Sequence, residues 1–475
     1  MNLSLKRTGL LCAVAYTAAI TSLPVLAAPK KAGIAPETSL EALDSRFHQT
    51  STHLYAKLAR SEAYPKANNI KALAESVDRL RSQNQQIDAV ATVIRNIGLV
   101  EKNIDTTPII NICGLLLETN EWNTASELYK RLKKQGDKSL VSNVSLSMAK
   151  YHFARNEWKE TIGIVESARS DLPPEDYNHA LLMQGIALQH LQKHRVALAQ
   201  YAKITKSSRY YAAARLNMAV ANIRQDWWTD AHIIINDLLK DKAPASNSAL
   251  TDRLYTVLGY SFLQQQYYRN SRDAFRNVNL DGQYTNKALL GIALTAAYQD
   301  DYVGALNAIK ILKDKKAGDL PVDEANLLQP YFYEKLQQLT TANAGYAEAI
   351  LYYEKRISSI KDALQVSPEE INKQLGAGSS NSVTINGEVV DLGEKLPKFV
   401  FDNIRLLALF EPHVSKMGDA TLQREYNALS ADYNRILKNA AQSVLDEKAS
   451  NITHYMNQSR YGLARMQDND TATPK

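Results

Sequence analysis

The chain has 475 residues, of which 45% are hydrophobic and 22% charged, so it can bury a core and is not broadly disordered. Its 19 glycines and 14 prolines make up about 7% of the chain, against roughly 12% on average, which argues against an all-β sandwich or propeller and against collagen-like or low-complexity sequence. The 56 basic and 50 acidic residues leave a net charge of +6, too small to indicate a nucleic-acid-binding surface.

The N-terminus has the pattern of a bacterial-type secretory signal. Lys6 and Arg7 precede an apolar stretch that runs to Leu26, and Val25-Leu26-Ala27 supplies small residues at the −3 and −1 positions. We therefore expect a signal peptide over residues 1–27, cleaved before Ala28, and a periplasmic mature protein; the alternative is an uncleaved membrane anchor. No later segment approaches 18 apolar residues, so we expect no transmembrane segment in the mature chain.

One cysteine, Cys113, remains after cleavage. A single cysteine cannot form an internal disulfide, and Cys113 lies in the apolar run 112–115, so it is predicted to be a buried thiol.

Residues 28–104 are predicted to be a helical region ahead of the main array. Thr38-Ser39-Leu40-Glu41 is a capping-box pattern, a second helix is expected from about Ile70, and a third carries the apolar stripe from Ile87 to Ile97. This region is either a capping bundle or a set of early repeats that the sequence does not reveal.

A repeat of about 35 residues follows over residues 105–360, in about seven units. In each unit an aromatic residue precedes a small residue by three positions, and a large apolar residue follows the small one by four. The pairs are Trp122/Ala125, Trp158/Thr161, Trp228/Ala231, Tyr268/Ser271, Tyr302/Ala305 and Tyr346/Ala349, with Ala197 as a further small residue and Arg195 near its aromatic position. The small residues are 36, 36, 34, 40, 34 and 44 positions apart, which predicts stacked helical hairpins with a small residue where two helices cross.

At this point the chain resembles the tetratricopeptide repeat family. Tyr255-x2-Leu258-Gly259-x2-Phe262, followed by Tyr268, Ser271 and Phe275, has the residue order and spacing of that family, although several units lack the glycine and most lack the closing proline. The resemblance implies an all-α fold, a right-handed α-solenoid of helical hairpins with helical N- and C-terminal extensions.

The remaining segments are predicted from composition and periodicity. Residues 361–396 form a flexible region in which Asn386-Gly387 indicates either a small exposed hairpin or a disordered loop. Residues 397–466 are helical, with a stripe from Leu422 to Ala440 that is expected to pack against the neighbouring helix containing Phe399 and Phe410. Residues 467–475 are expected to be a disordered tail.

Motifs for catalysis or cofactor binding are absent from the sequence. His190 and His194 would share a helix face, but no third ligand accompanies them, and we interpret them as solvent-facing residues at a helix end. The chain has no nucleophile elbow and no phosphate-binding loop. The segment after residue 397 is too short for the catalytic domain of a lytic transglycosylase. We therefore expect no enzyme, no cofactor and no metal.

The predicted function is a periplasmic scaffold or adaptor that binds a protein or peptide in a concave groove, in envelope assembly. The alternatives are a structural subunit of an envelope machine and a non-enzymatic regulator of cell-wall or polysaccharide synthesis. By resemblance to the tetratricopeptide family, residues at a fixed offset from the small residue line the groove. They are Lys150, Phe153, Gln189, His190, Arg224, Tyr260, Gln264 and Tyr298.

Overall fold

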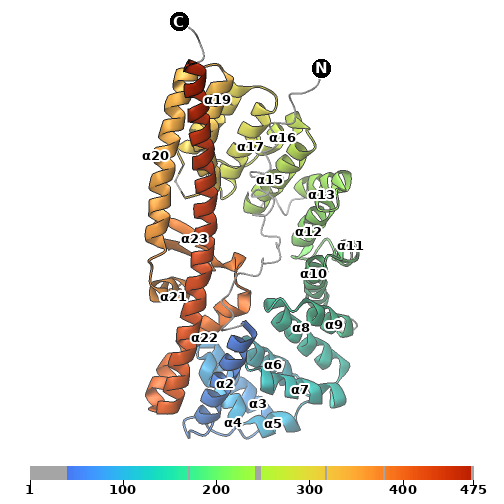
Figure 1. The fold of residues 1–475 in the computed structure, drawn as a ribbon. Coiled ribbons are helices and arrows are strands. Elements are labelled where there is room, and N and C mark those ends of the chain that lie inside the picture. Colours follow the sequence, from blue (N-terminus) through green and yellow to red (C-terminus); the bar gives the residue numbers. More distant parts are fainter. Residues whose placement is uncertain (1–39, 169–171, 241–247, 316–317, 378–379, 472–475) are drawn as a thin grey trace.

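The structure is a computed structural model that describes residues 40–168, 172–240, 248–315, 318–377 and 380–471. The predicted signal peptide and the capping residues Thr38 and Ser39 lie outside these ranges. Within them the chain is almost entirely helical, and Figure 1 shows helices stacked in succession around a curved path. The predicted fold class, an all-α solenoid, is confirmed.

Eight helical hairpins follow one another in the described ranges, preceded by α2 (Leu40–Leu58). A short helix, α5 (Ile97–Lys102), follows the first hairpin. The hairpins are α3 (Ile70–Ser82) with α4 (Gln86–Arg95), α6 (Pro108–Glu118) with α7 (Trp122–Gln135), α8 (Lys138–Ala154) with α9 (Trp158–Ser167), α10 (Pro174–His190) with α11 (His194–Tyr201), α12 (Tyr211–Ile223) with α13 (Trp228–Lys240), α15 (Ser248–Gln264) with α16 (Tyr268–Arg276), α17 (Thr285–Ala297) with α18 (Tyr302–Lys313), and α19 (Leu320–Lys335) with α20 (Leu339–Ala363).

Each hairpin turns through one left-handed residue that is not glycine. The next backbone amide bonds the carbonyl five residues earlier, as Glu121 does to Leu116 at 2.7 Å, which is the Schellman ending of a helix. The turn residues, with φ between 57° and 62°, are Asn84, Asn120, Asn156, Gln192, Asp226, Gln266, Asp300 and Gln337. Asparagine and aspartate tolerate this conformation better than other side chains, so the chain makes these turns with few glycines.

The turns fix the repeat register, because the second helix starts two residues after each turn residue and the small residue follows three positions later. All the small residues so defined are fully buried: Ala89, Ala125, Thr161, Ala197, Ala231, Ser271, Ala305 and Ala342. The Tyr346/Ala349 pair predicted for the last unit is therefore wrong, since Gln337 places Leu339 and Ala342 in those positions and makes the last step 37 rather than 44. His194, rather than Arg195, occupies the aromatic position of the third unit.

The first residue of the second helix packs on the next hairpin. Trp122 stacks on Tyr151 with ring centroids 4.8 Å apart, and Tyr268 stacks on Tyr298 at 5.7 Å. Neighbouring hairpins are therefore joined by ring contacts as well as by aliphatic packing.

The segment after α20 contains a β-hairpin. After α21 (Pro368–Ala377), strands β1 (Ser382–Ile385) and β2 (Glu388–Asp391) pair antiparallel around Asn386 and Gly387, whose φ values of 48° and 84° fit the predicted Asn-Gly turn. The hairpin is not simply exposed, because Val383, Ile385 and Val390 are buried. A 3-10 turn, η1 (Leu392–Glu394), follows it.

Two final helices close the superhelix. α22 (Lys398–Met417) lies beside α23 (Ala420–Thr471), a helix of 52 residues, about 78 Å long at 1.5 Å per residue. The stripe from Leu422 to Ala440 is buried and packs against α22 as predicted, but α2 packs there too. Figure 1 shows α23 running from α2 and α22 to α19 and α20, so it touches both ends of the superhelix. Residues 467–471, predicted to belong to a disordered tail, are the last residues of this helix.

The hydrophobic core is divided unequally. One continuous cluster joins α2–α8 with α20–α23, whereas the hairpins between them have four smaller clusters. Cys113 is fully buried in the large cluster, and burial raises the pKa of its thiol to about 12, as expected for a packed cysteine.

A glycine substitution tests the packing between hairpins. A Cβ on Gly291 would lie 2.3 Å from the buried ring of Phe275, so Gly291→Ala should lower the free energy of unfolding by about 1–3 kcal/mol. Gly163 is also helical, but a Cβ there would meet nothing within 4 Å, so Gly163→Ala should raise it by about 0.5–1 kcal/mol. Urea denaturation followed by circular dichroism measures both, and equal effects at the two positions would contradict the packing.

Candidate functional site

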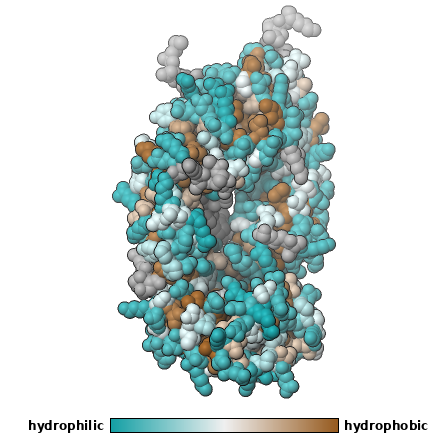
Figure 2. All heavy atoms as spheres, turned by 180° about the vertical axis from the view of Figure 1, so that it is seen from behind, coloured by the Kyte–Doolittle hydropathy of each residue, from teal (hydrophilic) through white to brown (hydrophobic). Residues whose placement is uncertain are grey.

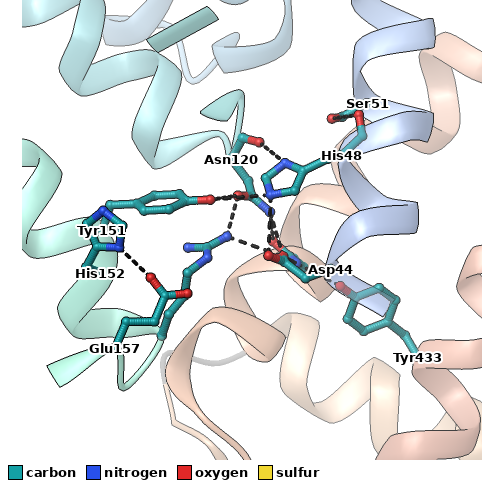
Figure 3. Close-up of polar contacts among 10 residues, drawn as sticks. Asp44, His48, Ser51, Asn120, Tyr151, His152, Glu157 and Tyr433 are labelled. Carbon is teal, nitrogen blue, oxygen red and sulfur yellow. Dashed lines mark hydrogen bonds and ion pairs between the residues drawn. The ribbon is translucent and has the colours of Figure 1, made fainter. Parts of the chain in front are cut away.

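A buried polar cluster joins the first hairpins to the N- and C-terminal helices (Figure 3). Its centre is Asn120, the turn residue between α6 and α7. Its side-chain amide donates to Asn403 on α22 at 2.9 Å, and its side-chain oxygen accepts from Tyr151 at 2.9 Å and from Arg155. Asn403 in turn donates to the hydroxyl of Tyr433 on α23 at 2.7 Å. The contacts of Asn120 therefore connect the α6–α7 turn to α8, to α22 and, through Asn403, to α23. We call these residues, together with Asp44 on α2, the α2 junction.

The charges of the α2 junction are Asp44 on α2 and Arg155 at the end of α8, 3.3 Å apart. Burial alone would raise the pKa of Asp44, but the hydrogen bond to His48 and the charge of Arg155 outweigh it and lower that pKa to about 2. The guanidinium of Arg155 lies over the ring of Tyr151 at 3.6 Å and 5.1 Å from that of Phe399. Arg155 is thus held by packing as well as by charge.

Asp44, His48 and Ser51 have the residue types of a hydrolase triad, but their geometry excludes one. Ser51 is fully buried, and its hydroxyl donates to the backbone carbonyl of His48 at 3.1 Å, which leaves no exposed nucleophile. Nδ1 of His48 lies 2.9 Å from the carbonyl oxygen of Asn120. The group acts in packing the helices together.

A second buried ion network joins the β-hairpin to the last solenoid helices and α23. Arg356 on α20 donates to Asp323 on α19 at 3.1 Å and to Glu388 on β2 at 3.1 Å, and Lys448 on α23 lies 3.6 Å from Glu388. All of these side chains are largely buried, so removing one partner would leave an uncompensated charge.

Two ion pairs and a histidine–carboxylate contact connect α2 to the N-terminal part of α23. Lys57 pairs with Asp419, the residue before α23, and Arg46 pairs with Asp432, while His53 lies 2.8 Å from Glu425 between them. Since the order of the partners is reversed along the two segments, these contacts favour the antiparallel packing of α2 on α23.

Two of the predicted groove residues are not available to a partner. Gln189 and Tyr260 are buried between hairpins. Gln189 accepts from the hydroxyl of Tyr201 at 2.7 Å and donates to the carbonyl of Asn217 at 3.1 Å, while Tyr260 donates to the carbonyl of Lys287 at 2.7 Å. The prediction is wrong for these two residues because the next first helix covers each of them, α12 for Gln189 and α17 for Tyr260.

The other predicted residues reach the surface to different extents. Lys150, Gln264 and Tyr298 are exposed, whereas Phe153 and Arg224 are half-buried. His190 is half-buried and stacks on Trp158, and His194 is buried, so the prediction that both histidines face solvent is wrong.

The structure adds side chains in the first two turns of several first helices, eighteen residues before the small residue. His179, Arg253 and Lys287 have this offset on α10, α15 and α17, and Glu324 has it on α19. The same repeat register could have found them. Glu324 is buried, and burial raises its pKa to about 8.

The cations of the first helices affect one another across hairpins. Burial, followed by the charges of Lys150 and Arg209, lowers the pKa of His179, and burial with the charge of Arg253 lowers that of Lys287 against the opposite effects of Asp319 and Glu394. Figure 1 shows the first helices α8, α10, α12, α15 and α17 nearer the centre of the molecule than the second helices, and Figure 2 shows the surface hollowed at the centre of its face. We call these first helices the inner face.

Metal-ligand clusters and membrane-spanning helices are both absent from the ranges that the structure describes. No group of three or more histidine, cysteine, aspartate or glutamate side chains there could hold a metal ion. Among the helices so described, none combines the length and the apolar character that crossing a bilayer requires.

Comparison with known proteins gives no match to a family model and none to a curated protein. Among solved structures the chain is similar to RapI in its apo form, with 13% identity and a TM-score of 0.44 over 80% of this chain and 98% of that one. It is also similar to the APC/C hetero-tetramer Cut9–Hcn1, with 13% identity and a TM-score of 0.27 over 81% and 73% of the two chains. A circular tandem repeat protein with novel repeat topology aligns at 10% identity and a TM-score of 0.15 over 91% and 98%. The chain's own turns and buried small residues, rather than these likenesses, define it as a closed solenoid of degenerate tetratricopeptide-like hairpins.

The α2 junction can be tested through its acid. Asp44→Asn should lower the free energy of unfolding at pH 7 by about 2 kcal/mol, because a carboxylate with a lowered pKa stabilises the fold above its ordinary pKa. The parent should lose this advantage as the pH falls from about 4 to about 2, so parent and variant should converge there. Urea denaturation at several pH values measures this difference, and a gap that stays constant down to pH 2 would contradict the role of Asp44.

Proposed function

We propose that this protein is a non-catalytic scaffold that binds an extended acidic segment of another protein along the inner face. The observation that carries the proposal is the set of cationic side chains on four of the five first helices of the inner face: Lys150 on α8, Arg224 at the end of α12, Arg253 on α15 and Lys287 on α17. A carboxylate-bearing segment would complement this charge.

Burial supports the same interpretation. Desolvation is the largest influence on Arg224, Arg253 and Lys287 and lowers the pKa of each, so these cations lie in a less polar environment than free solvent. Nε and Nη2 of Arg253 are buried and have no hydrogen-bond partner among the described residues. An anion brought to this face would be attracted more strongly than at an exposed surface.

The test uses tetramethylrhodamine-labelled deca-aspartate as a probe and measures fluorescence anisotropy. The parent should bind the probe, and affinity should fall with added salt because the attraction is electrostatic. A combined Lys150→Glu, Arg224→Glu variant should bind at least about tenfold more weakly while keeping its helical spectrum and melting temperature.

A matched variant separates the inner face from net charge. Lys134→Glu with Lys159→Glu makes the same charge change on exposed positions of the second helices α7 and α9. This variant should bind the probe like the parent. Equal weakening in both variants would contradict a specific inner face, and absence of binding by the parent would overturn the proposed function.

A second candidate is a structural subunit of an envelope machine. It is favoured by the closure of the superhelix through α23, which joins the first and last hairpins in one core. A structural subunit would use its outer faces and would not require the inner cations. Crosslinking in membranes with the inner-face variant therefore separates the two functions, because a structural role predicts unchanged crosslinked partners.

Export to the periplasm belongs to the same proposal and depends on the sequence of residues 1–27. We expect the chain purified from a bacterial periplasmic fraction to begin at Ala28, because cleavage follows the small residue at −1. Intact mass spectrometry measures the N-terminus. Recovery of the full-length chain from the membrane fraction would support the uncleaved anchor instead.

A further inference from the structure

Two histidines of α10 lie on the inner face and stack on aromatic rings. His179 is parallel to Tyr210 at a centroid distance of 4.6 Å, and His190 is parallel to Trp158 at 4.1 Å. Both imidazoles are half-buried on the same first helix, His179 in its second turn and His190 at its last residue. Stacking on these aromatic rings therefore fixes the orientation of both imidazoles.

The charged groups around both rings are mostly positive. His179 faces Lys150 from α8 and Arg209 from the turn before α12, with Asp176 on its own helix as the one opposing charge among the described residues that influence it. His190 faces Arg224 from α12, and α11 contributes His194 and Tyr201 near the same arginine, while α9 contributes the uncharged Trp158. Burial is the first cause and these cations the next that lower the pKa of each histidine, to about 4 for His190.

Hydrogen bonding also disfavours a proton on His190. Both of its ring nitrogens are buried and have no hydrogen-bond partner among the described residues. A protonated ring would therefore hold two donors without an acceptor, which is costly in a buried position. A carboxylate bound nearby would supply an opposing charge.

We propose that binding of an acidic segment to the inner face is coupled to proton uptake by His179 and His190, so that the segment binds more tightly as the solution is acidified. This inference rests on the proposed function and adds a regulation to the same site. The partner is an acidic polypeptide, and the proton concentration controls how tightly it binds.

The direction of the pH effect on affinity follows from the linkage between proton binding and segment binding. In the free protein the pKa of His190, about 4, keeps that ring neutral at pH 7.5 and at about pH 5.5, and burial lowers the pKa of His179 in the same direction. If the bound carboxylates restore one histidine to its ordinary pKa of about 6.5, the complex takes up a proton near pH 6. One such histidine makes the affinity about tenfold higher at about pH 5.5 than at about pH 7.5, and two make the ratio larger.

The experiment measures binding of labelled deca-aspartate between these two pH values at constant ionic strength. The probe remains ionised throughout, since aspartate has a pKa of about 3.9. Isothermal titration calorimetry with unlabelled deca-aspartate near pH 6, in two buffers of different ionisation enthalpy, counts the protons taken up. The parent should show about one proton or more and a rise in affinity of about tenfold.

Two variants identify the groups responsible. His179→Gln combined with His190→Gln should show no proton uptake and less than a twofold change in affinity for the probe between the two pH values. His454→Gln removes an exposed histidine of α23 outside the inner face and should keep the full pH effect. A thermal melt of each variant checks that the fold is intact.

The outcomes separate the two proposals. If the parent binds the probe in a manner that depends on Lys150 and Arg224, but with an affinity that does not change with pH, the coupling is overturned and the scaffold function stands. If the pH effect persists in the double histidine variant, other groups are responsible and the coupling is again overturned. If the parent binds the probe at no pH, the proposed function itself fails.

Discussion

The contact of α23 with both ends of the superhelix is the constraint on which the rest of the structure depends. In an open solenoid each hairpin touches only its neighbours, so curvature is set by small local rotations. Here one helix packs on α2 near one end and on α20 near the other, and these elements share a single core. The hairpins between them have smaller separate cores but fixed end points. Closure thus sets the curvature of the inner face.

The repeating hairpins could be predicted from the sequence because they depend on local spacing. The aromatic residue marks the start of the second helix, and the small residue three positions later marks where two helices cross at closest range. Both features depend on residues that are close together in the sequence. The last unit was misplaced because Tyr346 and Ala349 have the same spacing as the true positions, Leu339 and Ala342. The packing of α2 on α23 could not be predicted, since an apolar stripe shows that a face is buried but not against which helix.

The candidate site was predicted less completely than the fold, for a related reason. The position of a residue relative to the small residue indicates the inner side of a first helix, and Lys150 and Tyr298, chosen in this way, are exposed. It does not show how closely the next hairpin approaches, and Gln189 and Tyr260 are covered by that approach. The α2 junction was missed entirely, because Asp44, Asn120 and Asn403 are far apart in sequence and form no motif.

The pairing of α2 with α23 also bears on how the chain reaches its native state. Arg46 and Asp432 are 386 positions apart, so the part of the apolar side of α2 that α22 and α23 cover, with Phe47 against Phe410 and Tyr433, lacks this cover until nearly the whole chain has been made. Contacts at such separation form late and slowly, and uncovered apolar surface promotes aggregation in the interval. The central hairpins carry their own small cores and can fold as they emerge. Productive folding should therefore proceed from the middle outward, with the two termini meeting last.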